Sequence, residues 1–147
     1  MDSKIISAYG ANSFFSATPV RTPIAYTPAF FAAIKSWVLS PIIATSFEFN
    51  SVLANLYRDG NDSMGLHSDD EKELGKNPVI ASLSLGESRE IYFKHKNKKS
   101  NLVIPQVNGQ LMVMHGKTQE YWKHEIKKTK KIKKPRINLT FRNIITN

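Results

Sequence analysis

The sequence predicts a mainly β protein, a sandwich or jelly-roll barrel whose sheets are flanked by one helix. From residue 48 onward, roughly eight short segments alternate apolar and polar side chains, and turn-rich stretches separate them. Only one earlier stretch has helical periodicity. No internal repeat or linker divides the chain, so we expect residues 1–147 to form a single domain.

The helix is predicted near the start of the chain. Residues 1–27 are rich in turn formers, and Thr27-Pro28 then combines a helix-capping residue with a first-turn proline. Large apolar side chains follow with helical spacing, and Ser40-Pro41 ends the helix. These apolar residues are Phe30, Phe31, Ile34, Trp37 and Val38. We expect this face to pack on a sheet.

The strands are predicted from alternation and from the turns between them. They span residues 50–57, 79–85, 89–95, 102–107, 110–115, 120–126 and 136–144. Pro105 cannot donate a ladder hydrogen bond, so we expect its strand at a sheet edge. Asn108-Gly109 is a strong hairpin signal between the strands on either side of it.

Composition excludes several classes of protein. The chain has no cysteine, which excludes disulfides and cysteine-based zinc sites. Its N-terminus has no long apolar segment of the secretory type. Residues 29–47 are apolar, but Lys35, Pro41 and several serines suit a packed helix better than a membrane span. We expect a soluble, intracellular protein with no membrane contact.

Positive charge is concentrated in one segment. The net charge is +9, and residues 127–136 carry seven lysines and arginines with no acidic residue. A block of this kind is typical of a contact with a polyanion, most often nucleic acid. A solvated loop that only aids solubility is the alternative.

His67-Ser68-Asp69 is a candidate metal site. If residues 66–69 are extended, the side chains of His67 and Asp69 lie on the same face of the strand. One imidazole and one carboxylate are two of the three protein ligands in the 2-His-1-carboxylate sites of non-haem Fe(II) oxygenases. A second histidine from elsewhere in the chain would complete the site. Such a short pattern also occurs by chance in many proteins.

The last predicted strand has an unusual polar face. Its members are Arg136, Asn138, Thr140 and Arg142. If the helix covers the apolar face, the arginines point into the barrel, and they then need an anionic ligand because a buried unpaired charge is costly. Alternatively, the strand lies at the surface with its arginines in solvent. Periodicity alone leaves both arrangements open.

Four segments together resemble the AlkB family. They are residues 55–57 (N-L-Y), 67–71 (H-S-D-D-E), 122–124 (W-K-H) and 136–142 (R-I-N-L-T-F-R), in the order and spacing of that family. The chain is most similar to the eukaryotic DNA-repair AlkB homologues. The resemblance implies a double-stranded β-helix (jelly-roll) fold. It also implies an Fe(II)- and 2-oxoglutarate-dependent dioxygenase that demethylates nucleobases such as 1-methyladenine and 3-methylcytosine in DNA and releases formaldehyde.

The resemblance also implies roles for individual residues. His67, Asp69 and His124 correspond to the catalytic iron ligands, which leave room for 2-oxoglutarate and dioxygen. His115 is a rival to His124, but its surroundings do not match the family. The predicted 2-oxoglutarate residues are Arg136 on the distal carboxylate, helped by Tyr57 and Asn138, and Arg142 and Asn55 near the carboxylate that binds iron.

Substrate recognition is implied at five further positions. A base in a duplex has to flip out before its methyl group can reach the iron. Phe15 resembles the aromatic residue that stacks on this base, although core packing explains it equally well. Asp70 or Glu71 resembles the acidic residue that contacts the exocyclic amino group. Lys130 and Lys131 are expected on the phosphates.

Three alternatives stay open at this stage. The same chemistry could act on RNA, or the chain could be a catalytically silent jelly roll that only binds nucleic acid. An oxygenase acting on a protein or a small molecule is the third alternative. The intact ligand set argues against the silent module, and the basic segment argues against the third. We expect a monomer, located in the nucleus if the source is eukaryotic and otherwise in the cytoplasm.

Overall fold

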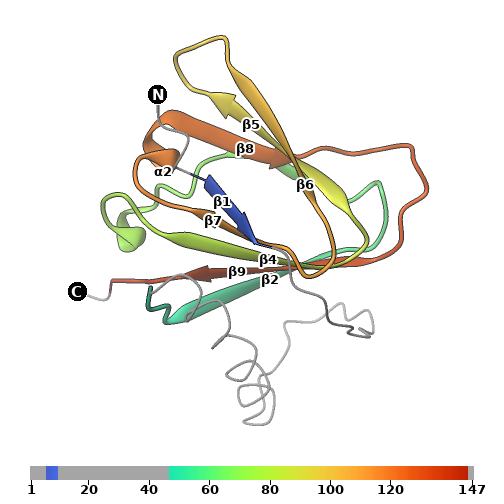
Figure 1. Ribbon diagram of the computed structural model, residues 1–147, viewed down its shortest axis with the longest axis horizontal. Coiled ribbons are helices and arrows are strands. Elements are labelled where there is room, and N and C mark those ends of the chain that lie inside the picture. The colour runs from blue at the N-terminus through green and yellow to red at the C-terminus, as the bar shows by residue number, and fades with distance from the viewer. Residues whose placement is uncertain (1–5, 10–46, 146–147) are drawn as a thin grey trace.

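The computed structural model describes residues 6–9 and 47–145, which form two antiparallel sheets (Figure 1). The first sheet has the order β1 (Ile6–Tyr9), β7 (Leu111–Met114), β4 (Ile80–Gly86), β9 (Arg136–Arg142), β2 (Ser51–Tyr57). The second has the order β3 (Met64–His67), β8 (Trp122–Ile126), β5 (Arg89–His95), β6 (Asn101–Gln106). Two short helices, η1 (Lys72–Leu74) and α2 (Thr118–Tyr121), lie in the connections.

The chain passes repeatedly from one sheet to the other. It crosses between β2, β3, β4 and β5, forms the β5–β6 hairpin within the second sheet, and then crosses again between β6, β7, β8 and β9. This wrapping is the double-stranded β-helix, or jelly roll, so the predicted fold class is confirmed. No helix of the described residues is long and apolar enough to cross a membrane.

The turn at Asn108-Gly109 is not a hairpin, so that prediction is wrong. β6 pairs with β5, whereas β7 pairs with β1 and β4, so the turn carries the chain from the second sheet to the first. Gly109 has a φ of 76°, and its N–H donates a hydrogen bond of 2.7 Å to the carbonyl of Ser84. A left-handed glycine serves either kind of turn, and the local sequence does not specify which sheet receives the next strand.

Several predicted strand boundaries shift. The segment predicted as a strand over 120–126 begins inside α2 and is extended only over Trp122–Ile126. The strand predicted over 136–144 ends at Arg142. Pro105 lies in β6 at the edge of the second sheet, as predicted. The predicted helix near the start of the chain lies outside the described residues.

β3 also ends earlier than expected. Its last residue is His67, and Asp69 lies in the connection that follows rather than on an extended segment over 66–69. The side chain of His67 therefore comes from the end of the strand and that of Asp69 from the connection after it.

The two faces of β9 have opposite character. Its polar side chains line the space between the sheets, which establishes the inward arrangement of the two arginines. On the outward face, Phe141 and Leu139 pack with Leu83 and Val113 of the neighbouring strands. An apolar cluster fills the rest of the space between the sheets, and Ile80, Phe93 and Met112 are its most deeply buried members. The polar cavity is thus set inside a conventional hydrophobic core.

Candidate functional site

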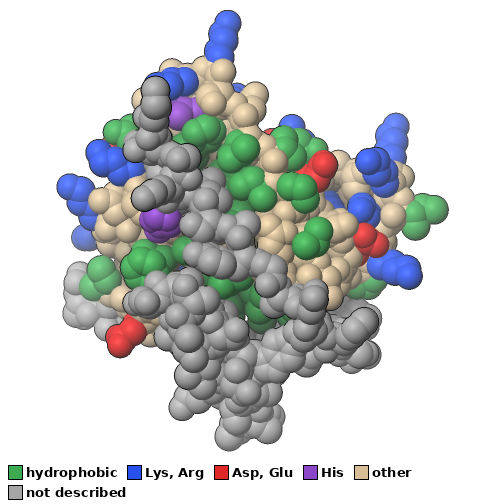
Figure 2. All heavy atoms as spheres, in the orientation of Figure 1, with side chains coloured by type: hydrophobic (Ala, Val, Ile, Leu, Met, Phe, Trp, Pro, Cys, Tyr) green, Lys and Arg blue, Asp and Glu red, His purple; other side chains and the backbone are tan. Residues whose placement is uncertain are grey.

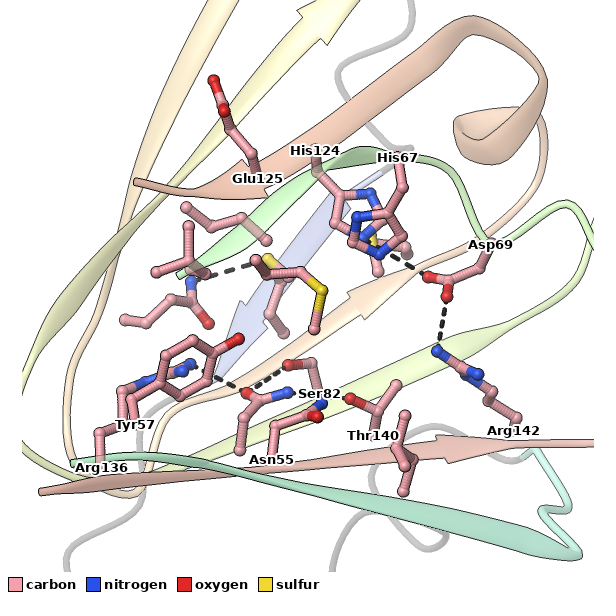
Figure 3. A pocket seen from close by; sticks show the side chains of 18 residues that line it. Asn55, Tyr57, His67, Asp69, Ser82, His124, Glu125, Arg136, Thr140 and Arg142 are labelled. Carbon is pink, nitrogen blue, oxygen red and sulfur yellow. Dashed lines mark hydrogen bonds and ion pairs between the residues drawn. The ribbon is translucent and has the colours of Figure 1, made fainter. Parts of the chain in front are cut away.

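A cavity lies between the two sheets, with about 550 Å³ of empty space that includes open solvent at its mouth (Figure 3). All five predicted 2-oxoglutarate residues line it, together with the three predicted iron ligands. These are Asn55, Tyr57, Arg136, Asn138 and Arg142, and His67, Asp69 and His124. In Figure 3, Tyr57 and Arg136 lie at one end of the cavity, and the two histidines lie at the other.

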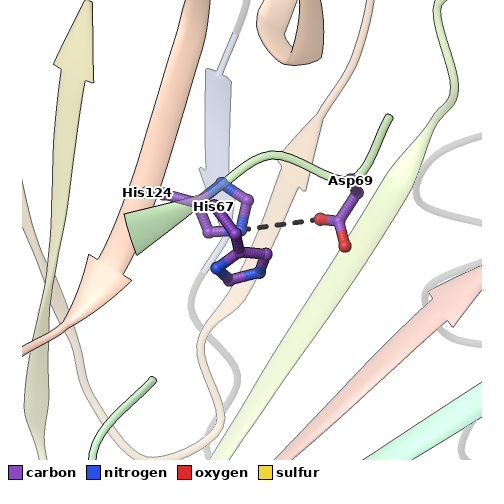
Figure 4. A group of neighbouring side chains, drawn as sticks. All are labelled: His67, Asp69 and His124. Atoms are coloured by element: carbon purple, nitrogen blue, oxygen red, sulfur yellow. Dashed lines mark ion pairs between the residues drawn. The ribbon is translucent and has the colours of Figure 1, made fainter. Parts of the chain in front are cut away.

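The end with the histidines holds a compact group of potential metal ligands (Figure 4). One ligand atom each from His67, Asp69 and His124 lies within 4.8 Å of the others. His67 and His124 are cross-strand partners in the β3–β8 pair, which places their rings 4.4 Å apart between centroids. Asp69 arrives from the connection after β3, and its Oδ2 lies 3.5 Å from Nε2 of His124.

Neighbouring groups fix the orientation of each of these side chains. Nδ1 of His67 lies 2.7 Å from the carbonyl oxygen of Gly65 and donates to it, so Nε2 is the ring nitrogen available to a metal. The backbone N–H of Asp69 donates to Oε1 of Gln119 at 2.9 Å. Nη2 of Arg142 donates to Oδ1 of Asp69 at 2.6 Å. Such outer contacts typically orient the ligands of a metal.

The chemistry of this group fits a divalent metal ion. Burial, with smaller effects of His67 and Arg142, lowers the pKa of His124 to about 3, so its ring is neutral at physiological pH. Burial also raises the pKa of Asp69 despite the opposing effect of Arg142, which means that the carboxylate lacks sufficient compensation for lost solvent. Oδ2 of Asp69 has no hydrogen-bond partner among the described residues. A cation held by two imidazoles and one carboxylate would satisfy it.

Arg136 dominates the opposite end of the cavity. Its side chain is 2% exposed, and Nη2 donates to Ser84 at 2.7 Å and to Asn138 at 2.9 Å. Nε and Nη1 donate to no described residue, and no carboxylate pairs with this guanidinium within the described ranges. Burial lowers the pKa of Arg136 to about 10, so the group is still charged at neutral pH. A buried guanidinium with free donors requires an anion.

Tyr57 completes the anion-binding end. Its ring centroid lies 5.1 Å from the guanidinium carbon of Arg136 and 5.6 Å from that of Arg89. Burial raises the pKa of Tyr57, and this effect exceeds the opposing influence of the two arginines. The phenol is therefore neutral and can donate its proton in a hydrogen bond to a carboxylate.

Three polar residues that were not predicted support this end. Ser82 donates to Oδ1 of Asn138 at 2.9 Å, and Nδ2 of Asn138 donates to Thr140 at 2.9 Å. Ser84 accepts from Arg136. Ser82 and Ser84 alternate within the predicted strand 79–85, and Thr140 shares the periodicity of β9, so the signal was present in the sequence. Gln119 gave no such signal, because its contact with Asp69 spans 50 positions.

The other two histidines of the chain, which include the rival ligand His115, lie elsewhere. Nδ1 of His95 accepts hydrogen bonds from the N–H groups of Asn97 and Lys98 and so closes the turn after β5. His115 precedes α2, and its carbonyl accepts from the hydroxyl of Thr118. Neither belongs to the group of metal-ligand candidates found among the described residues.

The predicted substrate residues, unlike the predicted iron and 2-oxoglutarate residues, do not gather in the cavity. Asp70 and Glu71 are exposed and do not line the cavity, although they directly follow Asp69. Oδ2 of Asp70 accepts from Ser68 at 2.8 Å and lies 3.4 Å from Nζ of Lys96, and the contact with Ser68 contributes most to lowering its pKa. Phe15 lies outside the described residues.

Most of the basic segment is exposed, but Thr129 and Lys133 are half-buried and Arg136 is buried. Lys130 and Lys131 are exposed in the connection between β8 and β9. Arg136, the last positive residue of the segment, lies inside the cavity instead. The surface charge of this connection therefore comes from its lysines alone.

Comparison with known proteins identifies the family. The model of the 2OG-Fe(II) oxygenase superfamily matches residues 16–142, which cover both ends of the cavity. The chain belongs to this superfamily. Its members use Fe(II) and 2-oxoglutarate, so the superfamily accounts for a cation-binding group and an anion-binding end in one cavity.

The most similar relatives of this oxygenase include AlkB homologues. Mouse alpha-ketoglutarate-dependent dioxygenase alkB homolog 3 is 42% identical over 119 residues, which are 74% of this chain and 42% of the mouse protein. Human DNA oxidative demethylase ALKBH2 is 39% identical over 109 residues, 69% of this chain and 42% of the human protein. The chain thus spans about two fifths of the length of these relatives.

A solved structure supports the fold. The structure of OsALKBH1 superposes with a TM-score of 0.55 and 20% identity, and the match covers 80% of this chain and 64% of the other. At this identity the likeness concerns the fold alone, and it agrees with the jelly roll described above.

Gln119 provides a test of the metal centre that does not depend on turnover. Replacing it with Leu removes the acceptor for the buried N–H of Asp69, so we expect Fe(II) affinity to fall about 10- to 100-fold. Anaerobic titration with Fe(II), or with Co(II) as a spectroscopic probe, measures the change. Glu120→Gln is the matched control, because this neighbour is exposed. Equal affinities of the two variants would contradict the orienting role of Gln119.

Proposed function

We propose that this protein is an oxidative demethylase of alkylated nucleobases in DNA, such as 1-methyladenine and 3-methylcytosine. The observation that carries the proposal is a single cavity with a His-Asp-His group at one end and a buried, anion-free Arg136 at the other. A five-carbon dicarboxylate that binds iron through one end presents its second carboxylate to such an arginine. The name of human ALKBH2, a DNA oxidative demethylase, supports the choice of substrate.

In the proposed mechanism, His67, Asp69 and His124 hold Fe(II) through two nitrogens and one oxygen. Bound Fe(II) and 2-oxoglutarate supply the oxidation, in which dioxygen is consumed, 2-oxoglutarate becomes succinate and CO2, and the hydroxylated methyl group leaves as formaldehyde. Arg142 holds Asp69 in place, and the neutral His124 binds the metal without first losing a proton.

The opposite end positions the co-substrate. Nε and Nη1 of Arg136 are free to donate to its distal carboxylate, and the hydroxyl of Tyr57 adds a third donor. Asn138 and Ser84 hold the guanidinium so that its free edge is pre-oriented. Asn55 and Arg142 also line the cavity, and Arg142 does so beside Asp69. The surrounding apolar core limits water at the reacting groups.

Nucleic acid is the proposed partner. The exposed lysines between β8 and β9 supply the charge for phosphate contacts, with Lys130 and Lys131 as the assigned residues. A second group of exposed lysines, Lys94, Lys98, Lys99 and Lys123, lies on β5, β8 and the turn after β5.

We assign Asp70 or Glu71 to the exocyclic amino group and Phe15 to stacking on the base. We further propose that residues 1–147 act as one domain and as a monomer in the nucleus or cytoplasm.

RNA is the second candidate substrate. The lysines and the cavity do not distinguish deoxyribose from ribose, because no assigned contact involves the 2′ position. Matched DNA and RNA oligonucleotides that carry the same 3-methylcytosine decide between them by their relative kcat/KM.

The central test is turnover. Purified protein with Fe(II), ascorbate, 2-oxoglutarate and a 3-methylcytosine oligonucleotide is expected to release succinate and formaldehyde, and Asp69→Ala is expected to reduce both to background. His115→Ala is the control, because this rival histidine lies outside the ligand group, and it should keep wild-type turnover. Absence of turnover in the wild-type protein with iron demonstrably bound would reject the demethylase proposal.

Arg136 is expected to govern the affinity for 2-oxoglutarate. Arg136→Met removes the charged donors and should raise the KM for 2-oxoglutarate roughly a hundredfold, with a smaller change in kcat. Arg58→Met is the matched control, since Arg58 is exposed and pairs with Asp62 on the surface. An unchanged KM in the Arg136 variant would remove this residue from the co-substrate site.

Lys130 and Lys131 are expected to contribute to DNA affinity through phosphate contacts. Replacing both with Ala should weaken duplex binding. It should also reduce the steepness of the slope of log binding constant against log salt concentration by about 1.8. Replacing the exposed Lys72 and Lys76 removes the same charge from another part of the surface and should leave the slope nearly unchanged. A wild-type slope in the Lys130/Lys131 variant would exclude this segment from the interface.

A further inference from the structure

Ile132 has an exposure that no other large hydrophobic side chain of the described residues approaches. It is 99% exposed, and the next most exposed of them, Ile145, is 53% exposed. An aliphatic side chain surrounded by water on all sides contributes nothing to the stability of the fold. Its whole surface is therefore available for contact with a partner.

The charge around Ile132 indicates what kind of partner this is. Lys130 and Lys131 precede it, and Lys133 and Lys134 follow it. Lys133 lies 3.4 Å from Glu87, whereas Lys130, Lys131 and Lys134 form no ion pair within the described ranges. In Figure 2, the right-hand edge, where Figure 1 shows the connection between β8 and β9, carries basic side chains with hydrophobic atoms among them. A partner that matches this surface is polyanionic and also has an apolar surface that can contact Ile132.

The segment that carries Ile132 is anchored on its β8 side. The buried guanidinium of Arg89 donates to the carbonyl of Lys127 at 2.7 Å and to the carbonyls of Asp59 and Asp62 at 2.9 and 3.0 Å. The N–H of Thr129 donates to the carbonyl of Gly60 at 2.8 Å. A Cβ on Gly60 would lie 2.3 Å from the carbonyl oxygen of Thr129, so this close approach requires glycine.

The β9 side is anchored as well. The N–H of Glu87 donates to the carbonyl of Pro135 at 3.1 Å, and the carboxylate of Glu87 contacts Lys133. Both sides of the loop are thus attached to the barrel, and the backbone carbonyl of Lys131 also lies close to Gly60, whereas the side chain of Ile132 is exposed. Ile132 is thus exposed on a loop whose two sides are both bonded to the barrel.

Resting on the proposed action on nucleic acid, we propose that Ile132 is an apolar wedge that inserts between stacked nucleobases while the flanking lysines contact phosphates. Aliphatic side chains that enter base steps unstack them, and a single side chain is enough to occupy one step. A membrane surface would need a larger apolar area than one residue provides. Unstacking next to the lesion lowers the cost of moving the alkylated base towards the cavity.

The test measures binding and unstacking without turnover. A short oligonucleotide with 2-aminopurine in place of one adenine reports unstacking, because its fluorescence rises when the base leaves the stack. We expect wild-type protein to raise the fluorescence and Ile132→Ala to abolish the rise. Affinity should fall about tenfold while the salt slope stays unchanged, since no charge is removed. Ile132→Phe should restore both the fluorescence rise and the affinity for the oligonucleotide.

The control variant is Leu102→Ala, which shortens an exposed aliphatic side chain on β6, 42% exposed, outside the basic segment. It should behave as wild type. Gly60→Ala provides a second variant, because it displaces the loop without touching Ile132, and it should also reduce the fluorescence rise. Equal melting temperatures of the wild-type and Ile132→Ala proteins show that folding is not the cause.

The outcomes separate the wedge from the demethylase. Wild-type fluorescence and affinity in Ile132→Ala would overturn the wedge, whatever the parallel turnover assay reports. Unstacking by wild-type protein in the absence of turnover would leave the wedge in place and reject the demethylase. Binding to vesicles of phosphatidylserine and phosphatidylcholine that depends on Ile132, without oligonucleotide binding, would overturn the wedge in favour of a membrane contact.

Discussion

Buried charge is the constraint on which the interior of this protein depends. β9 brings two arginines into the space between the sheets. Arg142 is compensated by Asp69, but Asp69 then lacks a partner for its second oxygen, and Arg136 has no anion among the described residues. The side chains of the cavity therefore suit a cation at one end and an anion at the other. A metal ion and a dicarboxylate together satisfy both requirements, which neither could do alone.

The same constraint explains the composition of the sheet around β9. A jelly-roll strand ordinarily points its apolar side chains towards the partner sheet. Here Ser82 and Ser84 on β4 and Asn138 and Thr140 on β9 face that way instead, and they supply hydrogen bonds to one another or to Arg136. Ala81 and Leu83 of β4 and Leu139 and Phe141 of β9 pack on the opposite face. The alternation of side chains along β4 and β9 thus produces the polar end of the cavity around Arg136.

Much of this arrangement could be predicted from the sequence. Alternation located most of the strands, and the family resemblance selected His124 over His115 and the inward arrangement of β9 over the outward one. The crossing turn at Asn108-Gly109 and the role of Gln119 could not be predicted. Each depends on which distant segments lie side by side, and neither leaves a periodic pattern in the local sequence.

The pairing of His67 with His124 has a consequence for the motion of the protein. β3 is an edge strand of four residues, and within the described residues its only strand partner is β8, with an irregular register. The two histidines lie directly opposite each other across this short ladder. A metal ion bound by both histidines, as proposed, would cross-link the two strands across this irregular ladder. Amide hydrogen exchange along β3 would then slow as the metal site fills, because the cross-link would oppose local opening of this edge.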